Sequence, residues 1–288
     1  MEITKSKEHT LICSDVFEGL NVIPDKSVDL IFIDPPYNIG KIFENTEDHW
    51  QNDNEYLKWC YKWIDLCIQK MKSDASMYIM TSTQFMPYFD IYIRKRLLIL
   101  SRIIWHYDSS GVQAKNYFGS MYEPILFCVK NPKNYCFNYH DILVEAKTGA
   151  KRHLIDYRGK YPKEYNSKKV PGNVWQFSRV RYRMKEYENH PTQKPTALLE
   201  RIILASSDEG DVILDPFAGT FTTSIVAMSL NRQSISIDIS KEYYKIGLRR
   251  VLGMKEYEGQ LLNPPRKTYK EIKQTELFNE VLTLVMNQ

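Results

Sequence analysis

Short apolar runs alternate with amphipathic stretches along the chain, as strands alternate with helices in α/β proteins. Four runs are short enough to be buried strands, and they cover residues 30–33, 77–80, 122–129 and 212–214. An amphipathic stretch predicts a helix over residues 56–71, with one face formed by Leu57, Tyr61, Ile64, Ile68 and Met71. A second helix is predicted to begin at Pro195 and to end before Gly210. The pattern favours a sheet of mainly parallel strands, whose carboxyl ends bind ligands.

Composition restricts the class of protein. The 288 residues, 43% hydrophobic and 26% charged, suffice for one catalytic domain with an insertion. No apolar run is long enough to span a bilayer, and residues 1–7 lack the apolar core of a secretory signal, so we expect a cytoplasmic protein without a membrane partner. The cysteines show no metal-ligand spacing, so reduced thiols and no metal site are expected at Cys13, Cys60, Cys67, Cys128 and Cys136.

Positive charge is concentrated in one segment. The whole chain has a formal net charge of +4, but residues 131–189 alone contain 13 Lys and Arg against 6 Asp and Glu. Glycines, prolines and many aromatic residues mark the segment as an irregular insertion, and a basic, aromatic surface can contact phosphates and base edges. The alternative is a solvated loop region whose charges only keep the protein soluble. The candidate DNA-binding residues are Lys115, Lys151, Arg152, Arg158, Lys168, Lys169, Arg179, Arg181 and Arg183.

The first chemical motif follows the apolar run at residues 30–33. Asp34, Pro35, Pro36 and Tyr37 place a carboxylate, two prolines and an aromatic ring at the end of a predicted strand. Proline lacks an N–H group and has a fixed φ, so the Pro35 carbonyl and the Asp34 carboxylate can both face outward as acceptors. Together with a stacking surface from Tyr37, they suit a flat ring that bears an amino group, such as adenine with its N6. A proline-rich turn after a buried strand is the alternative interpretation.

The second motif follows the run at residues 212–214 and reads as strand, tight turn and helix. A helix N-terminus presents free N–H groups, and a glycine in the turn lets a ligand approach the backbone closely. Asp238 ends the next predicted strand, about 20 residues further on, where an acidic residue in such folds meets ribose hydroxyls. A nucleoside-type cofactor is therefore expected at the turn, which consists of Asp215, Pro216, Phe217, Ala218, Gly219 and Thr220.

These motifs together resemble those of an adenine-N6 DNA methyltransferase that depends on S-adenosylmethionine. Their order resembles that of the beta class within the N4/N6 amino-methyltransferase family. In that class the DPPY block precedes the target-recognition segment and the cofactor block comes last, as Asp34 and Phe217 do here. Residues 190–195, His-Pro-Thr-Gln-Lys-Pro, match a further block of the class, and Cys13-Ser14-Asp15 resembles its early adenine-contacting segment. The segments at residues 107–115 and 170–175 look closest to solitary or restriction-linked enzymes that modify palindromic hexamers such as ATGCAT or AAGCTT.

The resemblance implies a Rossmann-like, doubly wound mixed sheet of the class I methyltransferase type with an inserted target-recognition segment. Residues 1–130 and 190–260 would form the catalytic and cofactor-binding domain, residues 131–189 the insertion, and residues 261–288 a helical tail. Double-stranded DNA is the implied substrate. A homodimer and a cognate restriction endonuclease are partners that the resemblance leaves open, and the target sequence cannot be read from the chain.

The resemblance also implies a role for each site residue. Asp34 and the Pro35 carbonyl would accept the N6 hydrogens of an adenine flipped out of the duplex, and Tyr37 would stack on that base. Phe217 and Asp238 would hold the cofactor's adenosine, Asp15 its adenine amino group and Lys194 its carboxylate. The rest of the cofactor site would be formed by Asp215, Ala218, Gly219 and Thr220.

One position departs from the class, which commonly has a second glycine where this chain has Phe221. We expect the Phe221 side chain to point away from the ligand, because Thr222 and Thr223 can still cap the following helix.

Three other functions remain. A cytosine-N4 DNA methyltransferase has the same architecture but usually carries Ser at the position of Asp34. A non-catalytic DNA-binding protein is disfavoured by the intact Asp34, Tyr37, Phe217 and Lys194. A nicotinamide dehydrogenase is disfavoured because the glycine turn lacks the GxGxxG spacing and the basic segment would have no purpose.

Overall fold

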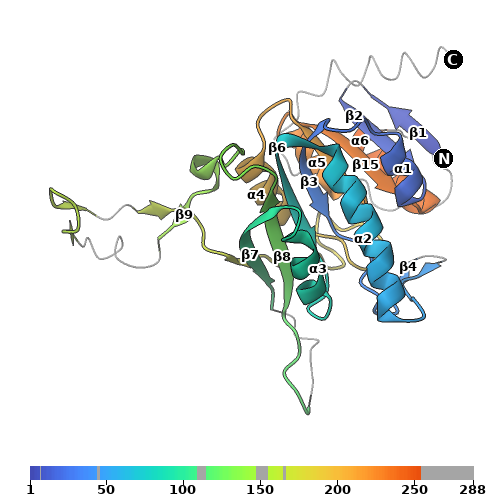
Figure 1. Ribbon diagram of the computed structural model, residues 1–288, viewed down its shortest axis with the longest axis horizontal. Helices are drawn as coiled ribbons and strands as arrows, with labels where there is room; N and C mark the ends of the chain where they lie inside the picture. Colours follow the sequence, from blue (N-terminus) through green and yellow to red (C-terminus); the bar gives the residue numbers. More distant parts are fainter. Residues whose placement is uncertain (7, 44–45, 109–114, 147–154, 165–166, 254–288) are drawn as a thin grey trace.

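The computed structural model describes residues 1–288 apart from 7, 44–45, 109–114, 147–154, 165–166 and 254–288 (Figure 1). The predicted helical tail at residues 261–288 therefore lies outside the described residues, as do Lys151 and Arg152. None of the described helices is long and apolar enough to cross a membrane. In the described part all five cysteines are free thiols; four are buried and Cys136 is partly exposed.

A large sheet of nine strands runs through the described part of the chain. Its centre is parallel, because β2, β15, β14, β3 and β6 pair in the same direction. β1 and β8 pair antiparallel with their neighbours, so the sheet is mixed, as predicted. In spatial order the strands are β1 (Glu2–Lys5), β2 (His9–Cys13), β15 (Gln233–Asp238), β14 (Val212–Asp215), β3 (Val28–Ile33), β6 (Met71–Met80), β8 (Tyr122–Val129), β7 (Leu98–His106) and β13 (Val174–Gln176).

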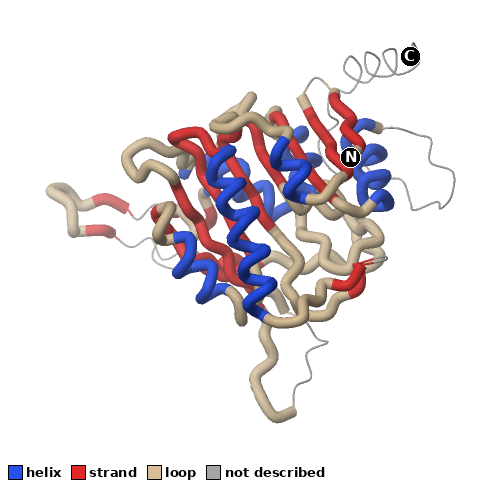
Figure 2. The backbone as a smooth tube through the Cα atoms, turned by 45° about the vertical axis from the view of Figure 1, so that its right-hand side comes forward, coloured by secondary structure: helices blue, strands red, loops and turns tan. Residues whose placement is uncertain are grey.

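Helices cover both faces of this sheet (Figures 1 and 2). One face packs against α1 (Val16–Asn21), α2 (Asp53–Lys70) and α3 (Met86–Ile93), and the other against α4 (Thr196–Ser206), α5 (Thr222–Ser229) and α6 (Lys241–Leu252). Strands buried on both faces are apolar without interruption, which explains the short apolar runs of the sequence. The predicted doubly wound α/β fold is confirmed.

The boundary between α2 and β6 differs from the expected one. The helix begins earlier, after Asn52, whose side chain accepts a hydrogen bond from the Glu55 N–H at 3.0 Å. It ends at Lys70, and Met71 already belongs to β6. The buried face is also broader than the predicted line of residues, because α2 lies across the sheet and buries more than one row of side chains. Its buried apolar residues are Tyr56, Leu57, Cys60, Trp63, Ile64 and Cys67.

The basic segment at residues 131–189 has two structural parts. In its first part a 3₁₀ helix packs beside α4, and the ribbon of the short strands beyond it stands away from the rest of the molecule (Figure 1). Its last strand, β13, pairs in parallel with β7 and adds a ninth strand to the large sheet. The short elements are a 3₁₀ helix (Tyr139–Ile142), β9 (Val144–Glu145), β10 (Ile155–Asp156), β11 (Lys163–Glu164) and β12 (Lys168–Lys169).

Candidate active site

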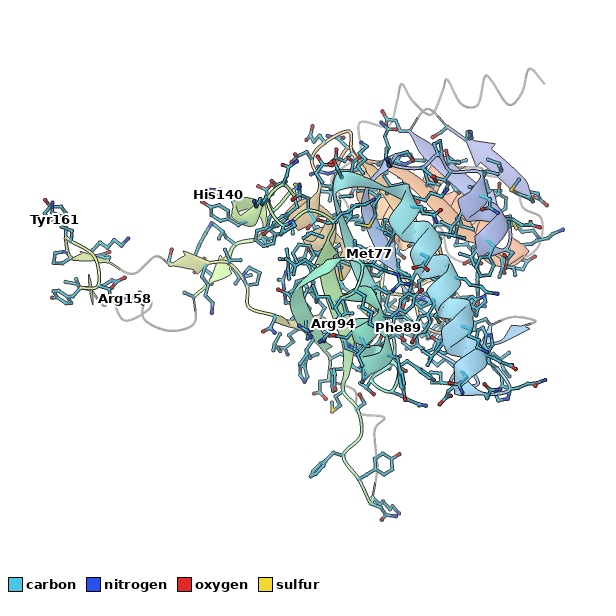
Figure 3. All side chains as sticks on the ribbon, viewed as in Figure 1. Met77, Phe89, Arg94, His140, Arg158 and Tyr161 are labelled. Atoms are coloured by element: carbon cyan, nitrogen blue, oxygen red, sulfur yellow. The ribbon has the colours of Figure 1, made fainter. Side chains whose placement is uncertain are left out.

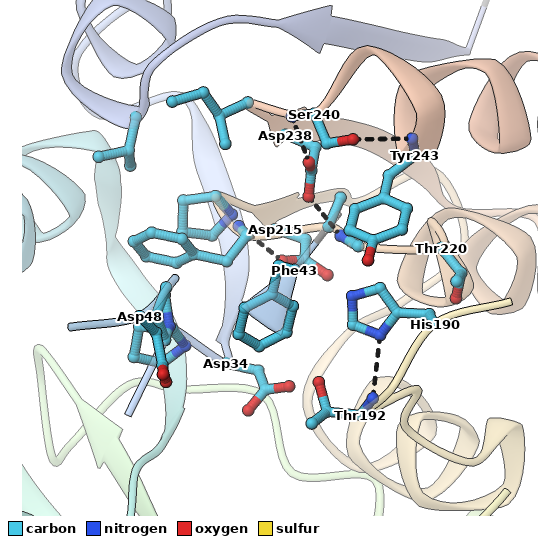
Figure 4. Close-up of a pocket in the computed structure, with 18 of the residues that line it drawn as sticks. Asp34, Phe43, Asp48, His190, Thr192, Asp215, Thr220, Asp238, Ser240 and Tyr243 are labelled. Carbon is cyan, nitrogen blue, oxygen red and sulfur yellow. Dashed lines mark hydrogen bonds between the residues drawn. The ribbon is translucent and has the colours of Figure 1, made fainter. Parts of the chain in front are cut away.

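A cavity of about 340 Å³ lies at the carboxyl ends of β3, β14 and β15 (Figure 4). Parallel strands of this kind present their loops at one edge of the sheet, and that edge is where such folds bind ligands. The cavity brings the two motifs together although about 180 residues separate them in sequence. All the predicted catalytic and cofactor residues line it, namely Asp15, Asp34, Pro35, Pro36, Tyr37, Lys194, Asp215, Phe217, Ala218, Gly219, Thr220 and Asp238.

Asp34 is the centre of a partly buried polar cluster at one end of the cavity. Lys194 Nζ lies 2.5 Å from its Oδ2, and the Tyr37 hydroxyl donates to its Oδ1 at 2.7 Å. The same hydroxyl lies 3.1 Å from Glu123 Oε2, and Lys194 Nζ lies 3.6 Å from that oxygen. One lysine thus serves two carboxylates, and one tyrosine hydroxyl lies between them.

The groups in this cluster shift one another's pKa values. Burial raises the pKa of Asp34, Glu123 raises it further, and Lys194 acts against both. Burial by itself would lower the pKa of Lys194, but Asp34 and Glu123 together hold it above its usual range. The lysine therefore stays charged at neutral pH, while two carboxylates share its single positive charge. Burial also raises the pKa of Tyr37, so its hydroxyl keeps its proton.

Two acidic residues of the site were not found from the sequence. Glu123 lies near the start of β8, opposite Trp105 of β7, in a run that reads as an ordinary buried strand. Asp48 is buried, and its carboxylate accepts hydrogen bonds from the backbone N–H groups of Tyr37 and Lys41. A charged residue inside an apolar run was the only sequence signal for Glu123, while Asp48 lies in a polar stretch and gave none.

The segment that carries Lys194 is held by side-chain bonds to the backbone. Gln193 is buried, donates to the Glu186 carbonyl at 2.6 Å and accepts from the Glu188 N–H at 2.7 Å. Glu186 in turn accepts from the Thr196 N–H at 2.9 Å, at the start of α4. These contacts direct Lys194 toward Asp34. The structure thus places Lys194 in an ion pair, and its contact with a cofactor carboxylate stays a prediction.

The cofactor turn is organised by Asp215 at the end of β14. Its carboxylate accepts hydrogen bonds from the Phe217 N–H at 3.1 Å and from the Thr223 hydroxyl at 2.5 Å. Burial raises its pKa to about 7. Asp215 therefore ties the turn to the first residues of α5. Phe217 lines the cavity and packs against Trp59 and Trp63 of α2.

Asp238 and His190 complete this end of the cavity. The Asp238 carboxylate accepts hydrogen bonds from the Gly219 N–H at 2.7 Å and the Ser240 N–H at 2.8 Å. Burial lowers the pKa of His190 to about 3, so its ring is neutral at pH 7. The Thr192 N–H donates to His190 Nδ1 at 3.2 Å, which leaves the proton on Nε2, the ring nitrogen that faces Gly219 (Figure 4).

These residues fit a nucleoside cofactor. Asp238 places a carboxylate in the cavity, and Phe217 and Val16 line it with apolar side chains. The contact of Asp238 with ribose hydroxyls stays a prediction. Asp15 also lines the cavity, and its carboxylate accepts from the Phe17 N–H at 2.8 Å to cap α1. Gly219 has a φ of +52°, and a Cβ there would lie 3.1 Å from the His190 ring. The turn needs glycine for its conformation and for this close approach.

We expect Gly219→Ala to weaken S-adenosylmethionine binding about tenfold, because the turn must move away from His190 and leave the left-handed conformation. Equilibrium dialysis with labelled cofactor measures the change. Gly172→Ala is the control, since a Cβ at that exposed glycine meets no atom within 4 Å. Equal cofactor affinity for the two variants would contradict the assigned role of Gly219.

Phe221 points away from the cavity, as expected, and is fully buried against the apolar face of α6. Its φ is +59°, and a Cβ on Gly247 of α6 would lie 2.6 Å from its ring. The expected cap is wrong, however. Neither threonine caps α5, because Thr223 bonds to Asp215 and Thr222 to Thr220.

Phe221→Gly is expected to destabilise the protein by about 2–4 kcal/mol, even though glycine suits the left-handed backbone. Relief of strain contributes about 1 kcal/mol, while losing a buried Phe costs about 3–5 kcal/mol. Urea unfolding measures the difference. Asn231→Gly, at an exposed residue with φ of +60°, should be neutral or stabilising, and a stabilised Phe221→Gly variant would contradict this account.

The predicted DNA-binding residues lie in two places. Lys115, Arg179, Arg181 and Arg183 belong to loops that follow the carboxyl ends of β7 and β13, at the same edge as the cavity. The others that are described, Arg158, Lys168 and Lys169, are exposed on the short hairpins, and Figure 3 shows Arg158 far from the sheet. Arg158 bonds to Asp156 at 2.8 and 2.9 Å.

Solved structures share this fold. The PvuII cytosine-N4-specific DNA methyltransferase matches with a TM-score of 0.67 over 97% of this chain and 94% of its own, at 16% identity. The M1.HpyAVI–SAM complex matches with a TM-score of 0.58 over 84% of this chain and 99% of its own, at 22% identity. The fold is that of the class I methyltransferases.

The sequence comparisons identify the family. The N6/N4 methyltransferase model, described as DNA methylase, matches residues 28–249. The DNA adenine methyltransferase YhdJ of Escherichia coli K12 is 56% identical over 258 residues, which are 90% of this chain and 87% of YhdJ. The type II methyltransferase M.HpaI of Haemophilus parainfluenzae is 37% identical over 85% of this chain and 74% of its own. The chain belongs to the N6/N4 family of DNA methylases, which confirms the resemblance seen in its sequence.

Proposed function

We propose that the protein methylates adenine N6 at a short sequence in double-stranded DNA. The observation that carries this function is the position of Asp34, with its partners Lys194 and Tyr37, in the same cavity as the cofactor turn. S-adenosylmethionine, the cofactor, supplies an electrophilic methyl group. The identity of 56% with a relative named as a DNA adenine methyltransferase supports adenine as the target base.

An aryl amine is a poor nucleophile, so catalysis depends mainly on its position. The Asp34 carboxylate and the Pro35 carbonyl would accept the two N6 hydrogens and direct the nitrogen lone pair toward the methyl group. The neighbouring Pro36 carbonyl already accepts from the Tyr56 hydroxyl at 2.7 Å, which fixes the backbone of the motif. As the nitrogen gains the methyl group and the bond from that methyl to the cofactor sulfur breaks, Asp34 would take one of the amine protons.

Entry of the base requires a rearrangement of hydrogen bonds. Both oxygens of Asp34 are engaged in this structure, one by Lys194 and one by the Tyr37 hydroxyl. The lysine compensates the buried charge, so the tyrosine is the partner that the amine replaces. Tyr37 would then be free to place its ring on the flipped base.

DNA is the substrate class of the family, and we propose that the basic loops at the cavity edge bind its phosphates. A cytoplasmic location, a homodimer and a cognate nuclease remain predictions. Sedimentation of the purified protein tests the homodimer. A nuclease gene beside the gene for this protein would support the cognate nuclease, since relatives such as M.HpaI are named type II methyltransferases.

The test is methyl transfer from labelled S-adenosylmethionine into unmethylated genomic DNA, followed by nucleoside analysis and sequence-resolved mapping. We expect N6-methyladenine at one short motif. N4-methylcytosine would instead identify the cytosine enzyme, which has the same architecture. DNA binding without any transfer would leave a non-catalytic binding protein.

A further inference from the structure

The loop between β7 and β8 exposes two neighbouring aromatic side chains. Within its described residues 115–120, called the arm below, Tyr117 is 76% exposed and Phe118 is fully exposed. Figures 1 and 2 show the described part of this loop projecting beyond the sheet edge. Neither aromatic ring has a ring contact within the described chain. Two adjacent exposed aromatic rings of this kind indicate a surface that a partner covers.

The residues that flank the loop, Tyr107, Asp108 and Met121, form the stem of the arm and are held by hydrogen bonds. The Tyr107 N–H donates to the Met121 carbonyl at 3.0 Å and so extends the β7–β8 ladder by one pair. Arg181 Nη2 donates to the Asp108 carbonyl at 2.9 Å, and the Arg179 guanidinium lies 5.0 Å from the centre of the Tyr107 ring. The arm therefore starts from a rigid base that is shared with the basic loop after β13.

This base lies directly beside the catalytic cluster. Glu123 is the second residue of β8, only three residues after the arm, and its Oε2 lies 3.1 Å from the Tyr37 hydroxyl. A duplex that delivers a base to Asp34 must therefore lie against the stem of the arm. The aromatic pair then stands at the same edge of the sheet as the cavity that Asp34 lines.

Charge favours DNA over a second copy of this chain as the partner. Lys115 on the arm and Arg179, Arg181 and Arg183 on the adjoining loop are cations, and residues 115–120 contain no carboxylate. Two copies that met through their arms would bring these cations together. A polyanion neutralises them.

We propose that Tyr117 and Phe118 insert into the DNA base stack beside the target adenine and occupy the space that the flipped base leaves. Apolar wedges of this kind unstack a base step and stabilise distorted DNA. Aromatic rings suit this task because every neighbouring base offers a face for stacking. The inference rests on the proposed function and adds a specific role for the arm in base flipping.

The test uses a duplex that carries the mapped site with 2-aminopurine in place of the methylated adenine, because its fluorescence rises when the base leaves the stack. Transfer to the natural duplex by the wild type is measured first, and its absence would overturn the proposed function. We expect the double variant Tyr117→Ser, Phe118→Ser to lose most of the fluorescence rise. Its kcat/KM for DNA should fall about tenfold, with S-adenosylmethionine affinity unchanged.

Leu98→Ser is the matched control, since Leu98 is an exposed apolar residue at the opposite end of β7. It should retain the full fluorescence rise and normal transfer. A double variant that behaves like this control would overturn the proposed role of the arm and leave the proposed function standing. Sedimentation of both variants adds a second criterion, because a wild-type dimer that becomes monomeric only in the double variant would identify the arm as a subunit contact instead.

Discussion

Asp34→Ala is expected to lower the rate of methyl transfer about 10³-fold while leaving the affinity for DNA and S-adenosylmethionine nearly unchanged. In the proposed mechanism the carboxylate accepts a hydrogen from the target amine and receives its proton, and such groups contribute about 10²–10⁴-fold. Its position at the end of β3 depends on the buried strand, which the substitution leaves intact. Single-turnover transfer with saturating cofactor and DNA measures the loss in kcat.

Asp25→Asn is the matched control for this substitution. Asp25 precedes the same strand at its opposite end, is largely exposed and pairs with Lys70 at 2.6 Å. The control should transfer methyl groups at the wild-type rate. If Asp34→Ala lost DNA or cofactor binding as severely as turnover, Asp34 would be a structural residue and the mechanism would be wrong.

Lys194→Met should reduce turnover at neutral pH at least about tenfold and shift the acid limb of the pH profile to higher pH. The charge of Lys194 lowers the pKa of Asp34, against burial and Glu123, so its removal raises that pKa. Asp34 must be ionised to accept a proton, so activity should recover as pH rises above the new pKa. Because two largely buried carboxylates lose the lysine that pairs with both, we also expect a loss of about 3 kcal/mol in stability.

The measurements for Lys194→Met are kcat and the KM for S-adenosylmethionine from pH 5.5 to 9.5. Lys72→Met is the control, because Lys72 also pairs with an aspartate, Asp29 at 2.7 Å, but is partly exposed and remote from the cavity. A variant with a raised KM and an unmoved pH profile would place Lys194 on the cofactor carboxylate, as the sequence resemblance implied, and would contradict a role through Asp34.

Some elements of the fold follow from local sequence patterns, whereas others depend on pairing between distant segments. Helix α4 follows its apolar spacing and its N-terminal proline, and strand β8 has the predicted bounds. The start of β6 was misplaced, because Met71 fits the helix spacing but pairs with Val28 in the sheet. Strand β13 lies within the basic segment, where only its pairing with β7 makes it a strand.

The same division runs through the active site. Motif residues such as Asp34, Gly219 and Asp238 could be named in advance, because local chemistry requires those residue types at those turns. Glu123 and Asp48 could not, since each acts through a partner distant in sequence or through the backbone of a separate loop. The pairing of Lys194 with Asp34 was missed for the same reason, as these two residues are brought together only by the folded sheet.

Read alone, the chain determined the α/β pattern, the order of motifs and the concentration of positive charge, and it predicted the two ligand-binding turns, because each of these features depends on a short stretch of residues. Tertiary structure decided which of those residues share a cavity and how one lysine pairs with two carboxylates. It also decided where the basic and aromatic side chains lie relative to Asp34. The reason is physical. Side-chain periodicity and turn chemistry act over a few residues, whereas burial and ion pairing depend on distances that exist only after the strands have aligned.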